Sequence, residues 1–371
     1  MADNNENKVL NVPHLRFPEF SGEWKKCKLG DLCNVLMCKR ILVSQTNTED
    51  GVPFYKIGTI GSTPDAYISK ELFDDYKVKY NYPRKGEVMI TCAGTVGKCV
   101  VYDGEDAYFQ DSNIVWIDNP TQYISNGFLF HLLSKVDWRK LNSTTIIRIY
   151  NDDLRNLKMS YPRKEEQQKI SHLLSLLDER IATQNKIIEK LQSLIKGLAA
   201  QLTQSGTPNI RLCDCLECHS STLLENCVSV TGSYPVYGAT GLIGYTNNYA
   251  YNGESILIVK DGSGVGSLSY VNDHFSVIGT LNYLTAKENY SILYLYYALM
   301  AFNFTPYITG MAIPHIYFKD YGKAKLFYPS IEKRIRIASL LHNIEQKLVV
   351  EQNLVISLST QKSYLLRMLF I

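Results

Sequence analysis

The chain has 371 residues, of which 45% are hydrophobic, so it is long enough to form more than one folded domain. No apolar run is long enough to cross a bilayer, and Met1 to Lys8 lacks the basic and apolar parts of a secretion signal. We therefore expect a cytoplasmic protein with no membrane partner. The formal net charge of +3 is too small to identify a nucleic-acid-binding protein by itself.

The first part of the chain has short apolar runs separated by Gly, Asn and Asp, which is typical of short strands joined by turns. We expect strands at 88–91, 99–102 and 114–117 and a helix at 127–135. Gly94 to Lys98 contains a Gly-Lys pair, but a phosphate-binding loop needs four residues between its glycines and a Ser or Thr after the lysine. We interpret this segment as a tight turn or a DNA-facing loop.

A long helix is predicted next. Pro162 suits the first turn of a helix, and Glu165 and Glu166 complement its positive end. Ser205 to Pro208 is a helix-ending segment. Between these ends, apolar residues recur in alternating steps of three and four, which is the seam of a coiled coil. The predicted seam residues are Leu174, Leu177, Ile181, Ile188, Leu191 and Leu198.

The remaining part of the chain repeats the first. Gly253 lies 167 positions after Gly86, and Pro329 lies 167 positions after Pro162. We expect strands at 255–259, 268–271 and 281–285, a helix at 292–302, and then a second long helix. Its predicted seam residues are Leu341, Ile344, Leu348, Val355, Leu358 and Leu365. Even a polar interruption of the seam recurs, as Gln184 and Glu351.

The repeat predicts an α/β (α+β) protein with two globular domains, 1–161 and 205–328, separated by two long helices, 162–204 and 329–371. A helix of this length spans about 60 Å, and each seam needs a partner. Antiparallel pairing of the two helices is the simplest solution, because each helix follows its own domain. A buried polar position in the seam would then help to fix their register, at some cost in stability.

Nine cysteines are irregularly spaced, which favours reduced thiols over a disulfide framework. Cys213, Cys215, Cys218 and His219 resemble a zinc cluster, and Cys227 could add a ligand. However, no second Cys-x-x-Cys pair is present, and the first copy of the repeat has no matching set. We therefore expect free thiols and no metal site.

Catalytic motifs are absent from the sequence as well. It contains no Gly-x-Ser-x-Gly elbow and no Asn/Asp-Pro-Pro-aromatic motif of amino-methyltransferases. We therefore expect no catalytic residue in this chain. Two alternatives remain open, namely a fragment of a nuclease or methyltransferase and a coiled-coil adaptor without DNA specificity.

Several segments together resemble the specificity subunits of Type I restriction-modification systems. They are Leu15 to Phe20, Trp24 to Leu32, Tyr150 to Leu157, and Tyr161-Pro162 with Glu166-Gln167. The second copy keeps Tyr328-Pro329 but has Lys333-Arg334 in place of Glu166-Gln167, which weakens the local match. The resemblance covers essentially the whole chain, and the duplicated order is its most specific feature.

This resemblance implies a non-catalytic subunit that binds double-stranded DNA, with each domain acting as a target-recognition domain for half of a split site. A spacer of about 60 Å would place the half-site centres about 10 to 18 base pairs apart. The family also implies two modification subunits, which bind around the helices and use S-adenosylmethionine to methylate adenine N6. Restriction subunits would use ATP and magnesium, so that this chain holds no cofactor itself.

DNA readers use cations for phosphates and polar side chains for base edges, so both kinds are expected near one surface. The candidates in the first domain are Lys39, Arg40, Gln45, Asn47, Lys56, Thr91, Thr95, Lys98, Thr144, Thr145 and Arg148. The candidates in the second domain are Tyr237, Thr240, Tyr245, Asn247, Asn248, Lys260, Ser263, Ser267, Thr309 and His315. The glycine-containing loops 91–98 and 260–267 are favoured, since glycine lets a backbone approach a ligand closely. Any single candidate can equally be an ordinary solvated loop residue.

Overall fold

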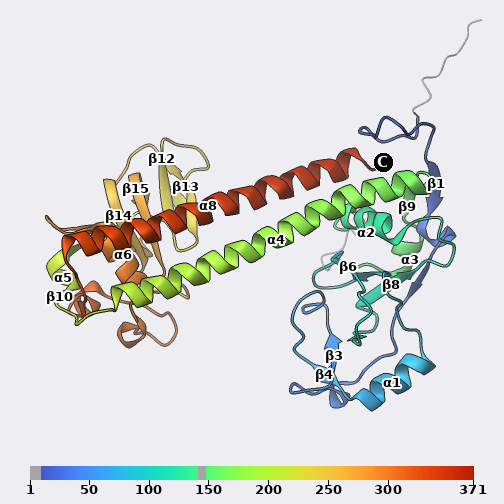
Figure 1. Ribbon diagram of the computed structural model, residues 1–371, viewed down its shortest axis with the longest axis horizontal. Coiled ribbons are helices and arrows are strands. Elements are labelled where there is room, and N and C mark those ends of the chain that lie inside the picture. Colours follow the sequence, from blue (N-terminus) through green and yellow to red (C-terminus); the bar gives the residue numbers. More distant parts are fainter. Residues whose placement is uncertain (1–9, 141–147) are drawn as a thin grey trace, which may run out of the picture. The chain divides into compact units, whose positions relative to one another are not determined.

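The computed structural model describes residues 10–140 and 148–371, so the candidates Thr144 and Thr145 lie outside the described residues. The chain divides into two units (Figure 1). Unit 1 comprises Met1–Thr183 and Val355–Ile371, and unit 2 comprises Gln184–Leu354. Each long helix therefore contributes one part of its length to each unit. No helix among the described residues is long and apolar enough to cross a membrane.

Unit 1 contains a four-stranded sheet of order β2-β8-β5-β6, a three-stranded sheet of order β4-β3-β7 and the pair β1-β9. Its elements before the long helix are β1 Lys25–Lys28, β2 Asn34–Leu36, β3 Val52–Tyr55, β4 Tyr67–Ile68, α1 Lys70–Lys79, β5 Val88–Thr91, β6 Cys99–Val101, β7 Tyr108–Phe109, β8 Ile114–Asp118, α2 Asn126–Lys135, α3 Asn151–Arg155 and β9 Lys158–Tyr161. Strands β5 and β8 pair with each other and are buried along their whole length. The core between this sheet and α2 also includes Ile170 and Leu174 of the first long helix.

Unit 2 contains a six-stranded sheet of order β11-β16-β14-β15-β12-β13 and the pair β10-β17. Its elements outside the long helices are β10 Ile210–Arg211, α5 Leu212–Cys215, β11 Leu216–Ser220, β12 Tyr234–Gly238, β13 Gly241–Thr246, β14 Tyr251–Val259, β15 Leu268–Val277, β16 Leu281–Ala286, α6 Ile292–Met300, α7 Phe318–Tyr321 and β17 Lys325–Leu326. Helix α6 is almost fully buried. It shares a core with Ile195, Ile337 and Leu341 of the two long helices, and this core fixes the sheet to them.

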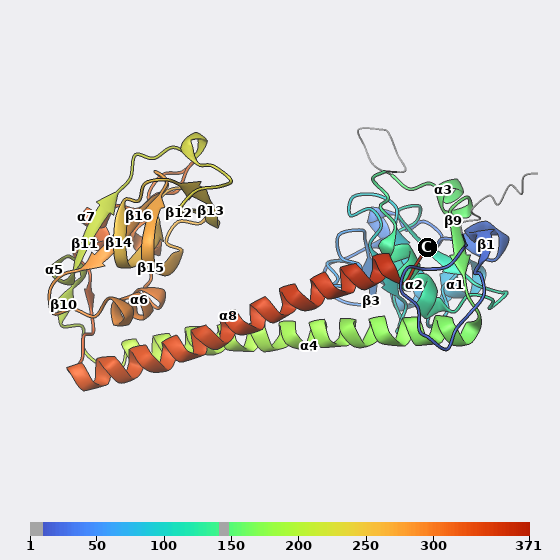
Figure 2. The ribbon, with the colours of Figure 1, turned by 90° about the horizontal axis from the view of Figure 1, so that it is seen from above.

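The two long helices are α4, Lys164–Thr203, and α8, Ile331–Met368. They form an antiparallel pair (Figures 1 and 2). Two side-chain contacts show this direction. In unit 1 Lys362 donates to Asp178, whereas in unit 2 the later α4 residue Gln184 donates to the earlier α8 residue Glu351. Every predicted seam residue is buried or half-buried. Gln184 and Glu351 are equivalent positions of the repeat, so the side chain of each copy pairs with its own counterpart.

The repeat extends to the way each unit is attached to its helix. Ser125 caps α2 and Ser291 caps α6, each by accepting a hydrogen bond from the backbone three residues later. Six residues beyond each cap, a buried side chain faces an acid on the long helix. In unit 1 His131 Nδ1 lies 4.0 Å from Asp178 Oδ2, and in unit 2 the hydroxyl of Tyr297 donates to Glu345 at 2.7 Å. At this equivalent contact between the domain and its long helix, unit 1 thus has a His–Asp pair and unit 2 has a Tyr–Glu hydrogen bond. We call the contact in unit 1 the His131 joint.

The His131 joint gives unit 1 an acid-sensitive contact. Burial lowers the pKa of His131 to about 4 from an ordinary value of about 6.5, although the carboxylate of Asp178 opposes this shift. The folded unit therefore binds fewer protons than the unfolded chain between these two pH values, and its stability falls as the pH drops through this window. We expect a loss of about 3 kcal/mol from this group between pH 7 and 4.

Urea unfolding at a series of pH values, followed by tryptophan fluorescence, measures this effect. His131→Gln should flatten the pH dependence between 6.5 and 4, while replacement of the exposed His14 by Gln should leave it unchanged. An identical slope for wild type and His131→Gln would show that this histidine is not the sensor.

The predicted fold class is confirmed, with two globular domains, an antiparallel helix pair and an internal repeat. Some elements differ in extent from the prediction. Strand β15 continues to Val277, whereas the sequence predicted its end at 271, because Asn272, Asp273 and His274 pair with β14 in an exposed stretch of the hairpin. Polar residues in such a stretch give no apolar signal. Helix α1 was not predicted, since Phe73 is its one buried residue.

Candidate nucleic-acid interface

Residues 92–98 form the loop between β5 and β6 in unit 1. The Gly97 amide donates to the Thr91 carbonyl at 2.8 Å, and the Thr91 amide donates to the Lys98 carbonyl at 3.0 Å. The Thr91 side chain is fully buried, and its hydroxyl bonds to the Thr95 carbonyl inside the same loop. Thr91 therefore holds the shape of the loop.

Residues 260–267 form the matching loop between β14 and β15 in unit 2. The Gly266 amide donates to the Val259 carbonyl at 2.9 Å, and the Val259 amide donates to the Ser267 carbonyl at 3.0 Å. The neighbouring segment matches as well. The Ile316 amide donates to the Lys260 carbonyl at 2.9 Å, and in unit 1 the Ile149 amide donates to the Cys92 carbonyl at the same distance. The two loops are thus built in the same way.

The glycines of these loops have two different roles. A Cβ on Gly97 would lie 2.2 Å from the indole of Trp138, and one on Gly266 would lie 3.3 Å from Phe304. These two glycines therefore let the loop pack against an aromatic ring of its own unit. By contrast, a Cβ on Gly262, whose φ is +99°, would meet nothing within 4 Å. The space beside the Cα of Gly262 is therefore empty, although its amide and carbonyl are both bonded within the unit.

The candidate residues of unit 1 include exposed side chains, and several of them make hydrogen bonds or ion pairs within the unit. Lys39, Arg40, Asn47, Thr95 and Lys98 are exposed. Side chains of several candidates also support nearby turns. Gln45 accepts a hydrogen bond from the Leu42 amide, and Asn47 accepts one from the Glu49 amide. Thr95, Lys98 and Arg148 donate to the backbone carbonyls of Ile57, Ile60 and Ser112, respectively. Lys56 pairs with Asp65 at 2.9 Å. These bonds bring the loop 92–98 against residues 57–60, so Thr95 and Lys98 lie on one surface of the unit.

Two of the candidates of unit 2, Tyr237 and Lys260, contact one short segment, residues 278–280. The Ile278 amide donates to the Tyr237 carbonyl at 3.0 Å, and the Lys260 amide donates to Thr280 at 3.0 Å. Two loops therefore meet here, one that follows β14 and one at the end of β12. Thr240, Asn247, Asn248, Ser263, Ser267 and Thr309 are exposed, while Tyr237, Tyr245, Lys260 and His315 are half-buried. Their roles as base or phosphate contacts stay predictions.

A further set of residues was missed by the sequence reasoning. Residues 309–315 form a loop, closed by mutual backbone hydrogen bonds between Thr309 and His315, that carries the exposed apolar side chains of Met311 and Ile313. Polar and charged side chains are the sequence signal for DNA contacts, and neither Met311 nor Ile313 carries it. The available signal was an apolar pair between Gly310 and Pro314, both of which are turn formers.

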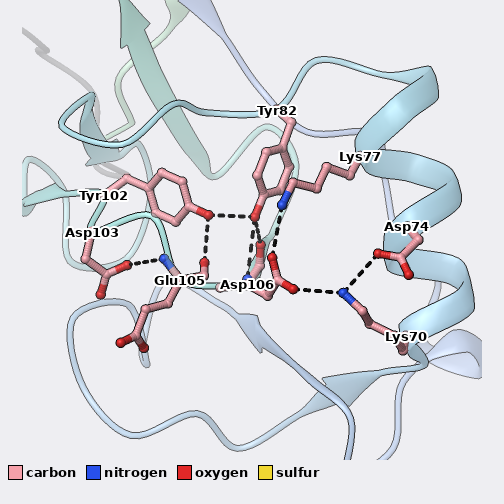
Figure 3. A network of polar contacts seen from close by, with 9 residues as sticks. Lys70, Asp74, Lys77, Tyr82, Tyr102, Asp103, Glu105 and Asp106 are labelled. Carbon is pink, nitrogen blue, oxygen red and sulfur yellow. Dashed lines mark hydrogen bonds and ion pairs between the residues drawn. The ribbon is translucent and has the colours of Figure 1, made fainter.

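The lysines of helix α1 are paired with acidic side chains of the same unit (Figure 3). Asp106 receives hydrogen bonds from Lys70 at 2.8 Å and from Lys77 at 3.0 Å, and Lys70 also pairs with Asp74. The bond from Lys70 is the main reason why the pKa of Asp106 lies below its usual value. Beside this group, the hydroxyls of Tyr82 and Tyr102 lie 2.9 Å apart. The lysines of α1 are thus neutralised within the unit.

All nine cysteines are free thiols. Burial raises the pKa of the Cys215 thiol to about 12 and that of the Cys218 thiol to about 11. Within residues 10–140 and 148–371, no group of three or more His, Cys, Asp or Glu side chains is arranged to hold a metal ion.

Comparison with known proteins adds an independent finding. The sequence model of the family described as "Type I restriction modification DNA specificity domain" matches residues 21–193 and again residues 210–358. The two matches contain the two copies of the repeat, each with most of its long helix.

Individual relatives agree with this match. A Haemophilus influenzae protein assigned as a type I restriction enzyme specificity subunit is 46% identical over 189 residues, which cover 51% of this chain and 46% of that protein. The EcoprrI specificity subunit of Escherichia coli is 28% identical over 112 residues, which cover 30% of this chain and 28% of that protein. The chain thus matches about half or less of the length of these relatives.

Solved structures share the fold. The S subunit of a Type I restriction-modification system from M. genitalium has a TM-score of 0.68 at 18% identity, over 97% of this chain and 99% of that one. A chain from a structure on complex assembly and conformational transition of the type I R-M system has a TM-score of 0.51 at 16% identity, over 95% and 98%.

Proposed function

Because the chain belongs to the family of Type I restriction modification DNA specificity domains, we propose that it is the DNA-recognition subunit of such a system. Each unit would read one half of a bipartite duplex target. The observation that carries this proposal is the pair of loops 92–98 and 260–267, which share their backbone closure and their neighbouring segment. Two similar loops, one on each unit, suit two separate half-sites.

The helices would set the distance between the half-sites. Helix α4 has 40 residues and α8 has 38, so each is about 60 Å long, or somewhat more than one and a half turns of duplex. The buried Gln184–Glu351 contact supports this role, since a polar pair in a seam favours one register. A fixed register gives a fixed spacer length.

The helices would also bind the modification subunits, two copies of which fit the repeat. Apolar side chains are exposed along both helices away from their seam, and such surfaces mark protein contacts. They are Leu176, Ile187 and Leu194 of α4, and Val349, Val350 and Ile356 of α8. The modification subunits would supply S-adenosylmethionine and methylate adenine N6, and restriction subunits would supply ATP-dependent, magnesium-dependent cleavage. This chain would supply the sequence specificity and no catalytic residue.

Methylation mapping in cells tests this proposal. We expect a new split adenine-methylated motif when the chain is expressed with its modification subunit, and none with the modification subunit alone. Thr95→Ala with Lys98→Ala should weaken or relax one half of the motif, and Ser263→Ala with Ser267→Ala the other half. Each lost base contact is expected to reduce discrimination by about 1–3 kcal/mol. No motif from a verified complex would favour the adaptor alternative instead.

A further inference from the structure

The 309–315 loop has a shape that its own backbone imposes. The Thr309 amide donates to the His315 carbonyl at 2.9 Å, and the His315 amide returns a bond to Thr309 at 2.8 Å. Between them Gly310 has φ +89°, and a Cβ at this position would lie 2.3 Å from the Ile313 carbonyl. The turn therefore requires glycine. The carbonyl of Ile313 is also bonded to His315 Nδ1 at 3.1 Å, which ties the tip to its base.

The loop is also fixed to the neighbouring loop 260–267. The Gly262 amide donates to the Pro314 carbonyl at 2.9 Å, and the Ile316 amide donates to the Lys260 carbonyl at 2.9 Å. These bonds lie on either side of the bridge between Asp261 and His315. The position of the tip is therefore set by the sheet through β14 and β15, and little conformational entropy remains to be lost when it meets a ligand.

The tip of this loop presents apolar side chains to solvent. Met311 has a relative exposure of 107%, so it does not pack against its own unit, and Ile313, at 65%, is only partly covered. The residues beside them include the polar Ser263 and Thr309 and also the apolar Ile308, Ala312 and Pro314. Met311 is the most exposed of the large apolar side chains here, since Ile308 is 37% and Ile313 65% exposed. One unbranched side chain that projects from a fixed loop fits a narrow slot between flat surfaces.

We propose that Met311 is a wedge that inserts between two adjacent base pairs of the half-site read by unit 2, with Ile313 supporting it at the edge of the groove. This inference rests on the proposed function, since it requires that unit 2 binds duplex DNA. Met and Ile are among the side chains that proteins insert between base steps, where they unstack the bases and bend the duplex. The hydroxyls of Ser263, Ser267 and Thr309 are placed to bind the backbone beside the opened step.

The test uses the complex of the full chain with its modification subunit and a duplex that carries the motif found by methylation mapping. The adenines of the second half-site and its flanks are replaced one at a time by 2-aminopurine, which brightens when its stacking is lost. We expect wild type to raise the fluorescence several-fold at one step, in addition to the methylated adenine, which the modification subunit takes out of the stack. That adenine serves as the internal reference.

Met311→Ala should lose the signal at the step and keep it at the methylated adenine. It should also bind the duplex roughly 10- to 100-fold more weakly, as expected from the loss of one buried Met side chain. Met311→Leu should retain both signals, since it keeps an apolar side chain of similar size. Val43→Ala is the matched control, because Val43 is a 90% exposed apolar side chain of unit 1 and should not affect the second half-site.

The following results would contradict the proposal that Met311 inserts between base pairs. An equal signal at the step from Met311→Ala would show that another side chain opens it, and no signal outside the methylated adenine in wild type would show that no step is opened. Loss of complex assembly in Met311→Ala, seen by size-exclusion chromatography, would make the tip a protein contact. If no chain-dependent motif is found at all, the proposed function fails before any duplex is made.

Discussion

Replacement of Arg16 by Ala is expected to lower the free energy of unfolding of unit 1 by about 3–5 kcal/mol. Arg16 Nε and Nη2 each donate to one oxygen of Glu166 at 2.7 Å, and the Glu166 side chain is 1% exposed. Without the guanidinium, the carboxylate would stay buried with the Trp24 indole N–H, at 3.3 Å, as its side-chain partner. An uncompensated buried charge is costly, and this cost is the source of the expected loss.

Two further variants serve as controls, one that removes both buried charges and one that breaks an exposed ion pair. Arg16→Met with Glu166→Met should recover most of the lost stability, since no charge remains buried. Arg155→Ala breaks the exposed pair with Asp152 and should cost less than about 1 kcal/mol. Urea unfolding followed by tryptophan fluorescence gives the values, because the three tryptophans, Trp24, Trp116 and Trp138, all lie in unit 1. Equal losses for Arg16→Ala and Arg155→Ala would contradict the argument.

Replacement of Phe370 by Ala is also expected to cost unit 1 about 3–5 kcal/mol, the usual range for a buried Phe. Phe370 is 3% exposed, its ring lies 4.8 Å from that of Phe128 on α2, and Leu369 beside it is 2% exposed. A cavity at this position would also loosen the end of α8, whose Met368 carbonyl accepts a bond from the Leu15 amide at 2.8 Å.

The control for this prediction is the next residue. Ile371 is 50% exposed, so Ile371→Ala should change the stability by less than about 0.5 kcal/mol. The same tryptophan signal measures both variants. A loss for Phe370→Ala no larger than that for Ile371→Ala would show that the residues after α8 do not support the core of unit 1.

The long helices could be predicted from the sequence because a seam in steps of three and four is a local, repeated signal. Their pairing with each other also followed, since each seam needs a partner. The Arg16–Glu166 pair and the packing of Phe370 against Phe128 could not be predicted, because they join residues far apart in the chain. No local pattern reports such contacts.

The structure also explains where the two copies of the repeat depart from each other. Gln167 bonds to the Ser125 amide and to the carbonyls of Tyr123 and Pro162, and Glu166 binds Arg16. At the equivalent positions of the second copy, Arg334 lies 4.1 Å from the ring of Tyr328, and Lys333 bonds to Ser205. Each copy thus anchors the start of its long helix by its own means.

The candidate site could be predicted in outline only. The sequence paired the two glycine-containing loops and attributed their glycines in general to close ligand approach, whereas Gly97 and Gly266 pack against Trp138 and Phe304. Exposure depends on the tertiary packing, so the sequence could not separate the buried Thr91 from the exposed Thr95. Which side chains touch DNA stays a prediction.

The placement of Leu369 and Phe370 in unit 1 has a consequence for how the protein is made. Unit 2 consists of one continuous stretch, Gln184–Leu354, whereas unit 1 needs residues from both sides of that stretch. During synthesis, the core of the half that emerges first is completed only by side chains translated more than two hundred residues after α4 begins. The half that emerges second can complete its core earlier. We therefore expect unit 2 to complete its core before unit 1, and a ribosome that stops after unit 2 to release a chain whose first domain lacks the side chains of Leu369 and Phe370.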